Sequence, residues 1–85
     1  MRKRNAREYG LTPEDRKHEI ERRFGAGQYT RAREILAGVA KPTEQILGAI
    51  VFLARNVDEL HELVDLANED PQTLLNAATV KEERG

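Results

Sequence analysis

One histidine of this chain has neighbours at a spacing that could support metal chemistry. His61 and Asp65 are four residues apart, so on a helix they would share one face, and Glu62 beside them is of the type that acts as a general base. A catalytic zinc needs three protein ligands, but the chain has only two histidines and no cysteine. We therefore interpret His61 as a surface residue of an acidic helix and predict no metal and no cofactor.

The remaining sequence lacks the arrangements on which catalysis depends. The other histidine, His18, has charged neighbours at helical spacing: Glu14, Glu21 and Arg22. Such a histidine is typical of a solvated ion-pair face rather than of a proton relay. The stretch GAG at residues 25–27 lacks the Lys and Ser/Thr of a phosphate-binding loop. We find no nucleophile–base pair and expect a non-enzymatic protein.

Length and composition predict one small intracellular domain. A chain of 85 residues hides roughly 60–65% of the surface that its unfolded form exposes. The absence of cysteine excludes disulfides and favours a reducing cytoplasm. The basic start is followed by no apolar segment, and the longest uncharged run, residues 45–54, is shorter than the ~20 residues of a membrane span. We expect a cytoplasmic protein that neither enters a membrane nor carries a secretory signal.

The sequence favours helices throughout. The chain has no Trp, two Phe and two Tyr, and its breaks are marked by glycine and proline. These signals predict five helices, at about residues 13–24, 28–39, 43–55, 59–69 and 71–80, with Asp58 as the cap of the fourth. The expected fold class is all-α, with about five short helices as stacked antiparallel hairpins, in a small bundle or a short solenoid-like array.

Two of the predicted helices have distinctive faces. The third contains ILGAIVFLA, which is apolar on all sides, so we expect it to be the central and most buried element. The fourth has an apolar stripe formed by Leu60, Leu63, Val64 and Ala67, and an acidic side formed by Glu59, Glu62, Asp65 and Glu69. Leu66 lies on that acidic side, outside the stripe. It is either surplus apolar surface for a partner or part of a wider core stripe.

The chain also shows internal similarity. With an offset of 28 residues, the apolar positions of the second and third helices fall on those of the fourth and fifth. Gly27, Tyr29, Ala32 and Leu36 have the spacing that resembles the helix junction of a tetratricopeptide repeat. That resemblance implies a helical-hairpin scaffold that binds peptides or proteins. It covers about half of one repeat, and the offset departs from the family's ~34 residues, so we do not assign the family.

The two halves of the chain have opposite charge. Residues 1–41 carry eleven Lys/Arg and six Asp/Glu, a net charge of +5, and residues 42–85 carry three and nine, a net charge of −6. Such a chain could hold a polyanion, pair with a second copy as a homodimer, or fold so that its halves attract each other. We expect a basic N-terminal arm at residues 1–11, one helical domain at 12–80 and a frayed end at 81–85.

One functional hypothesis is a nucleic-acid-binding regulator. The first two helices and the turn at residues 25–27 could form a helix-turn-helix. Its basic contact surface would consist of Arg2, Lys3, Arg4, Arg7, Arg31 and Arg33. The first helix offers only Ile20 and Phe24 as clear apolar anchors, and aromatic platforms for single strands are lacking.

The hypothesis that we favour is a small cytoplasmic adaptor or regulator that acts by protein–protein interaction. Its partner surface would be acidic and apolar, formed by Glu59, Glu62, Asp65, Leu66 and Glu69. Such a surface fits a basic partner protein, whose identity the sequence does not give. Nucleic-acid binding is the alternative, and self-association stays open.

Overall fold

A computed structural model of the chain describes residues 13–84. The elements in order are α1 (Pro13–Phe24), the 3-10 helix η1 (Ala26–Gln28), α2 (Tyr29–Leu36), α3 (Glu44–Leu53), α4 (Glu59–Glu69) and α5 (Pro71–Arg84). The described residues form five α-helices and no strand, so the predicted all-α helical fold is confirmed. None of these helices has the length and apolar character needed to cross a membrane.

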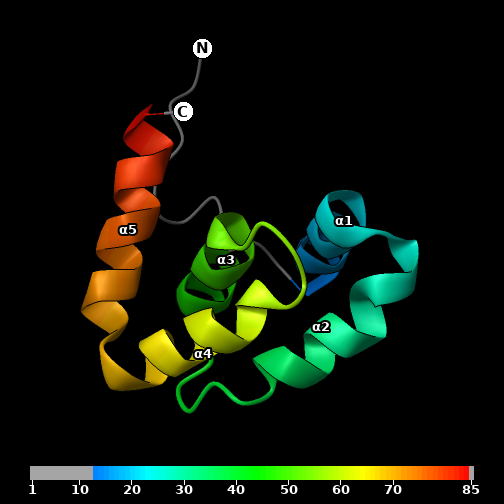
Figure 1. The fold of residues 1–85 in the computed structure, drawn as a ribbon, viewed down its shortest axis with the longest axis horizontal. Helices are drawn as coiled ribbons and strands as arrows, with labels where there is room; N and C mark the ends of the chain where they lie inside the picture. The colour runs from blue at the N-terminus through cyan, green and yellow to red at the C-terminus, as the bar shows by residue number, and fades with distance from the viewer. Residues whose placement is uncertain (1–12, 85) are drawn as a thin grey trace.

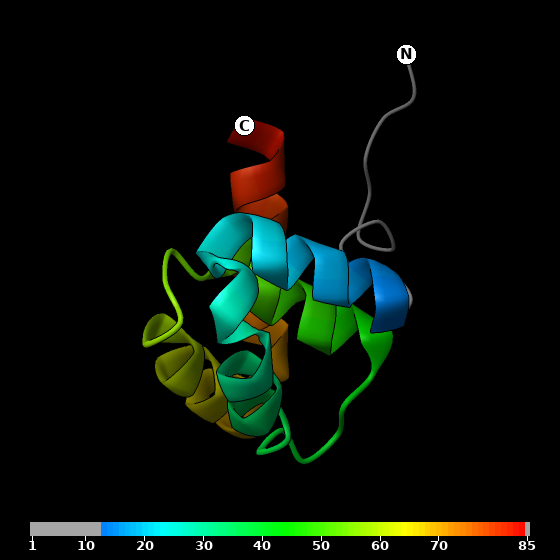
Figure 2. The same cartoon turned by 90° about the vertical axis from the view of Figure 1, so that its right-hand side faces the viewer.

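Helix α3 lies at the centre of the bundle. It packs against α1, α4 and α5, while α2 packs against α1 and α4. In Figure 1, α5 lies on one side of α3, and α1 and α2 lie on the other. Figure 2 shows the same bundle from the side of α1 and α2. The central position predicted for the apolar third helix is therefore confirmed.

The core draws side chains from all five helices, and its largest fully buried side chains come from four of them. The largest side chains with less than 2% exposure are Ile20, Ile50, Val51, Leu60 and Leu74. They come from α1, α3, α4 and α5, and no charged or polar side chain among the described residues is buried with them. Removing this apolar surface from water is the main force that holds the short helices together.

Local signals account for several helix ends. After α1, Gly25 adopts φ 111°, a conformation that residues with a side chain rarely adopt. Thr43 is the N-cap of α3, and its Oγ1 accepts a hydrogen bond of 3.1 Å from the Ile46 N–H. Asp70 precedes α5, and its carboxylate accepts from the Thr73 N–H at 3.2 Å and from the Thr73 hydroxyl at 2.6 Å.

Asp58 occupies the N-cap position of α4 as predicted, but it does not cap the helix with its side chain. The Asp58 side chain makes no capping hydrogen bond, and its backbone is helical. Instead, Asn56 Oδ1 accepts from the Glu59 N–H at 3.0 Å. The Asp58 carboxylate lies 2.7 Å from the Arg31 guanidinium of α2. Arg31, which is distant in the sequence, thus pairs with the Asp58 carboxylate that we expected to cap α4.

Helix α2 ends at Leu36, earlier than the Val39 that we expected. The chain turns there, and the Gly38 N–H bonds to the Ile35 carbonyl at 3.0 Å. Asn68 of α4 fixes the following loop: its side chain accepts from the Ala40 N–H at 2.8 Å and donates to the Gly38 carbonyl at 3.0 Å. The loop between α2 and α3 is therefore held by α4.

The C-terminal boundary also differs from the prediction. Helix α5 continues through Arg84, past the predicted end at about residue 80, and the fraying expected at residues 81–85 stays a prediction. Lys81 explains the difference, because its Nζ donates to the Phe52 carbonyl at 2.7 Å and lies 4.8 Å from the centre of the Phe52 ring. The predicted arm at residues 1–11 lies outside the described residues.

The 28-residue offset relates several positions that are buried in both pairs of helices. The pairs that are buried at both positions are Ala32/Leu60, Leu36/Val64, Val39/Ala67, Ile46/Leu74 and Ile50/Ala78. In addition, α2 packs against α4 and α3 packs against α5. The correspondence fails where α3 is buried on a face that α5 exposes, as at Val51 and Thr79. The internal similarity thus reflects shared packing positions, modified by the central location of α3.

Candidate interaction surfaces

Two residues of the predicted basic surface, Arg31 and Arg33, lie within the described part of the chain. Arg2, Lys3, Arg4 and Arg7 lie outside the described residues. Arg31 forms an ion pair of 2.7 Å with Asp58 and borders a hollow beside the loop between α3 and α4. Arg33 lies 5.8 Å from the centre of the Tyr29 ring and borders a different hollow. The two arginines of α2 therefore do not converge on one contact surface.

Two residues of the predicted acidic and apolar surface have structural contacts. Arg55 donates to Glu59 through its side chain at 2.8 Å and through its backbone N–H at 2.7 Å. These hydrogen bonds lower the pKa of Glu59 below its ordinary value and raise the pKa of Arg55. Leu66 is half-buried and packs against the core. Of the two alternatives for Leu66, the structure therefore favours a wider core stripe. Neither side chain is fully available to a partner.

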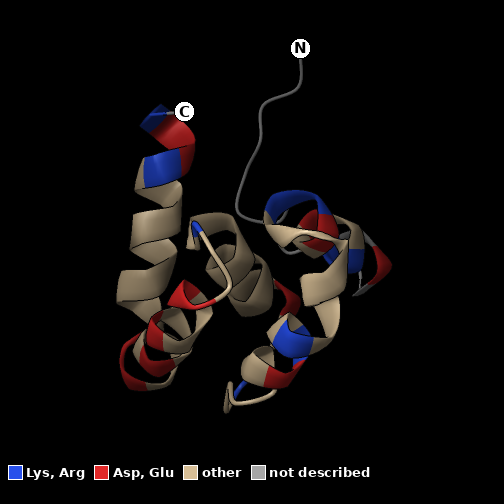
Figure 3. Ribbon diagram, turned by 45° about the vertical axis from the view of Figure 1, so that its right-hand side comes forward, with Lys and Arg blue, Asp and Glu red and all other residues tan. Residues whose placement is uncertain are grey.

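The other three acidic residues form what we call the acidic ridge: Glu62, Asp65 and Glu69. All three side chains are exposed, and none makes an ion pair with another described residue. Their spacing of three and four residues places them along one face of α4. Figure 3 shows α4 with acidic residues and no Lys or Arg. Residues 58–70 contain six Asp/Glu and no Lys/Arg, so no cation of α4 itself neutralises the three ridge carboxylates.

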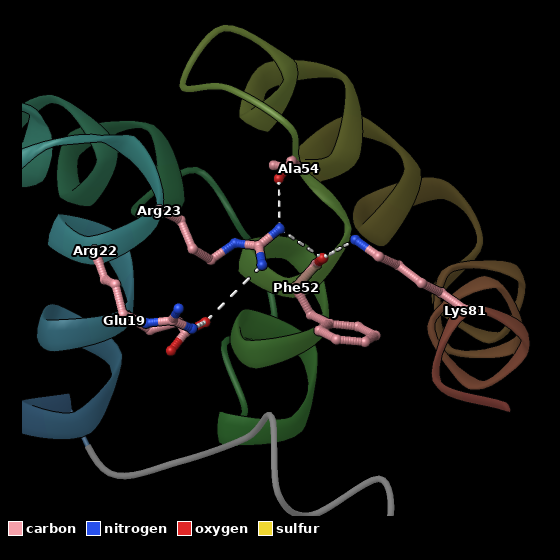
Figure 4. A network of polar contacts seen from close by, with 6 residues as sticks. All are labelled: Glu19, Arg22, Arg23, Phe52, Ala54 and Lys81. Carbon is pink, nitrogen blue, oxygen red and sulfur yellow. Dashed lines mark hydrogen bonds and ion pairs between the residues drawn. The ribbon is translucent and has the colours of Figure 1, made fainter. Parts of the chain in front are cut away.

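A polar network at the end of α3 joins three helices (Figure 4). The Arg23 guanidinium of α1 donates to the Phe52 carbonyl at 3.0 Å and to the Ala54 carbonyl at 2.9 Å. Lys81 of α5 donates to the same Phe52 carbonyl from the other side. Burial and the charge of Arg23 lower the pKa of Lys81. Both cations satisfy carbonyls that a helix end leaves without intrahelical partners.

This network has a structural role that the sequence analysis missed. Glu19 holds Arg22 at 2.7 Å and lies 3.9 Å from Arg23. The Arg23 Nε is buried and has no hydrogen-bond partner, so the residue's contribution comes from its terminal nitrogens. Positions 23 and 52 are 29 residues apart. The only local signal was the presence of cations in the last turn of α1.

A second hollow, of about 320 Å³, lies between α1, α2 and the region leading into α3. It is lined by Arg16, Lys17, Ile20, Tyr29, Arg33, Leu36, Ala37, Pro42 and Leu47. We call it the cationic hollow, because three of these residues are cations and none is acidic. Lys17 Nζ lies 5.3 Å from the centre of the Tyr29 ring, and the Arg33 guanidinium lies 5.8 Å from it. Sequence reasoning did not find this site, because its residues converge only in the folded chain.

The histidines take no part in a metal-binding cluster in the described part of the chain. Within residues 13–84, no three His, Cys, Asp or Glu side chains gather closely enough to hold a metal ion. His18 and His61 are both exposed. No family model matches the chain, and no curated protein or solved structure is similar enough to be matched to it. The function is therefore argued from the surfaces described above.

The carboxylate at the start of α5 leads to a prediction about pH. Hydrogen bonds from Thr73 lower the pKa of Asp70. A carboxylate with a lowered folded-state pKa stabilises the fold above its unfolded pKa of about 4, and that stabilisation is lost as the pH falls through the folded-state value. We expect the Asp70→Asn variant to lose less stability than the unchanged protein between neutral pH and acid.

Urea denaturation at a series of pH values measures this difference. Glu59 has a lowered pKa as well, so the variant should keep part of the pH dependence. Equal losses in the two proteins would contradict the role assigned to Asp70.

Proposed function

We propose that this protein is a small non-enzymatic adaptor or regulator of the cytoplasm, and that the acidic ridge of α4 contacts a basic surface of a partner protein. One observation carries the proposal. The ridge residues Glu62, Asp65 and Glu69 are exposed without an ionic partner among the described residues, whereas Asp58 and Glu59 are engaged by arginines.

The ridge carboxylates make no ion pair with another described residue, and only Glu62, in the first turn of α4, has a favourable interaction with the helix dipole. Carboxylates one turn apart on a helix repel each other by roughly 0.2–0.5 kcal/mol for each pair. A basic partner would convert this repulsion into attraction, and complementary charge raises association rates as well as specificity. The charge of the ridge is therefore suited to contact with another molecule.

The fold presents the ridge on a well-supported helix. The opposite side of α4 is anchored by Leu60, Val64 and Ala67, which are buried in the core. Asn68 ties the same helix to the loop between α2 and α3. Because α4 is fixed on its other faces, the backbone positions of the three acidic residues stay fixed without a partner. A charged surface held in this way loses little conformational freedom when it binds.

Reversing the ridge charge should remove partner binding. We expect the triple variant Glu62→Lys, Asp65→Lys and Glu69→Lys to capture at least about tenfold less partner protein from a lysate of the native host. The matched control is Glu14→Lys, Glu44→Lys and Glu83→Lys, which changes three exposed acids and the net charge by the same amount. Quantitative pull-down, with circular dichroism to verify folding, makes the comparison. Equal capture by the two variants would contradict the proposal.

A further inference from the structure

We infer that the cationic hollow binds a short peptide segment in which a large apolar side chain is flanked by carboxylates. This site shares no residue with the acidic ridge, so it adds a second class of partner to the proposed adaptor. The hollow lies between α1 and α2, the two helices nearest the viewer in Figure 2, and the region leading into α3.

The charge of the hollow selects an anionic ligand. Arg16, Lys17 and Arg33 line it, and the described residues of its lining include no acid. Lys17 and Arg33 both lie beside the Tyr29 ring, at 5.3 and 5.8 Å from its centre, and neither forms an ion pair with another described residue. Two cations that line one hollow, neither of them paired with an acid of the described residues, attract carboxylates.

The floor of the hollow selects an apolar group. Ile20 and Leu36 are buried core residues that form part of the lining, together with the half-buried Leu47. A volume of about 320 Å³ is at the lower end of the range of ligand pockets. An apolar side chain placed on this floor extends the core, while carboxylates on either side of it reach the cationic rim.

The same geometry favours a peptide over a nucleic acid. Single-stranded nucleic acids bind aromatic side chains by stacking bases on open ring faces. In this hollow Lys17 and Arg33 already lie beside the Tyr29 ring, and the other apolar contacts are aliphatic. The hollow therefore offers a pocket for a side chain and a cationic rim, which suits an acidic peptide.

Fluorescence anisotropy with a labelled Glu-Glu-Leu-Phe-Glu-Glu peptide and the full chain tests the inference. We expect saturable binding that weakens at least about tenfold when Leu-Phe is replaced by Ala-Ala, or when the four Glu are replaced by Lys. Lys17→Glu and Arg33→Glu should each weaken binding about fivefold or more, because each reverses a rim charge. The control Arg84→Glu makes the same charge change at an exposed position of α5 and should alter binding less than about twofold.

Several results would overturn the inference. Absence of saturable binding would do so, and so would equal affinity for the Ala-Ala peptide, which would mean attraction to charge alone. An effect of Arg84→Glu equal to that of Arg33→Glu would show that net charge, not the hollow, determines binding. Tighter binding of an oligothymidine probe, lost in Lys17→Glu and Arg33→Glu, would assign the hollow to nucleic acid instead.

Circular dichroism of each variant separates loss of binding from loss of fold. Because the ridge is unchanged in all these variants, the outcome is independent of the proposed function.

Discussion

Replacing Leu60 by alanine is expected to lower the free energy of unfolding by about 2–5 kcal/mol. Leu60 is 0% exposed and anchors α4 in the core. Its truncation removes buried apolar surface and leaves a cavity that a tightly packed interior closes only in part. Small domains have a total stability of roughly 0.05–0.15 kcal/mol per residue, so this loss is a large part of the whole. Urea denaturation followed by circular dichroism measures it.

Leu66→Ala is the matched control on the same helix. Leu66 is only half-buried, so its truncation should cost no more than about half as much. Equal losses for the two variants would contradict the core that we describe. The comparison also tests whether Leu66 belongs to the core. If it does, its truncation should have a small but measurable effect on the free energy of unfolding.

Replacing Arg23 by alanine is expected to destabilise the protein by about 1–3 kcal/mol. The variant loses two hydrogen bonds from α1 to the Phe52 and Ala54 carbonyls at the end of α3. It leaves the Ala54 carbonyl without this donor, and the Phe52 carbonyl keeps Lys81. The repulsion that Arg23 exerts on Lys81 also disappears, so the pKa of Lys81 should rise.

The neighbouring arginine is the control for this prediction. The Arg22 side chain is 72% exposed and pairs only with Glu19, whereas the Arg23 side chain is 23% exposed. Exposed ion pairs contribute about 0–1 kcal/mol, so Arg22→Ala should change the unfolding midpoint little. Thermal or urea denaturation of both variants gives the comparison. If Arg22→Ala is as destabilising as Arg23→Ala, then general charge effects, not the α3 contacts, explain the loss.

Much of the fold could be predicted from short-range patterns. The apolar run at residues 46–54 identified the central helix, because a helix that is apolar on all sides must be buried. Gly25 and the pair Asp70–Pro71 identified helix boundaries through backbone conformation and capping, which depend on neighbouring residues. These features are encoded within a few positions of the chain.

The contacts that were missed join residues far apart in sequence. Arg31 contacts Asp58 across 27 positions, and Asn68 contacts Gly38 across 30. Helical periodicity reports only neighbours three and four residues away. For this reason the sequence could not show that Asp58 is engaged by α2 instead of capping α4, nor that the side chains of the cationic hollow would meet.

The ion pair of Glu59 with Arg55 is one feature of the candidate site that the sequence spacing could have predicted. Arg55 and Glu59 are four residues apart, the spacing at which opposite charges pair near a helix. That spacing could have separated Glu59 from the exposed acids Glu62, Asp65 and Glu69. The structure thus reduces the predicted acidic surface to the ridge.

The central claim is that the protein acts by binding another protein. Affinity capture from the native host with the full chain, performed with and without nuclease, tests it most directly. We predict a specific partner protein that is retained after nuclease treatment and lost when the acidic ridge is reversed in charge. A partner that disappears on nuclease treatment would contradict the claim, because the bridge between the two proteins would then be nucleic acid.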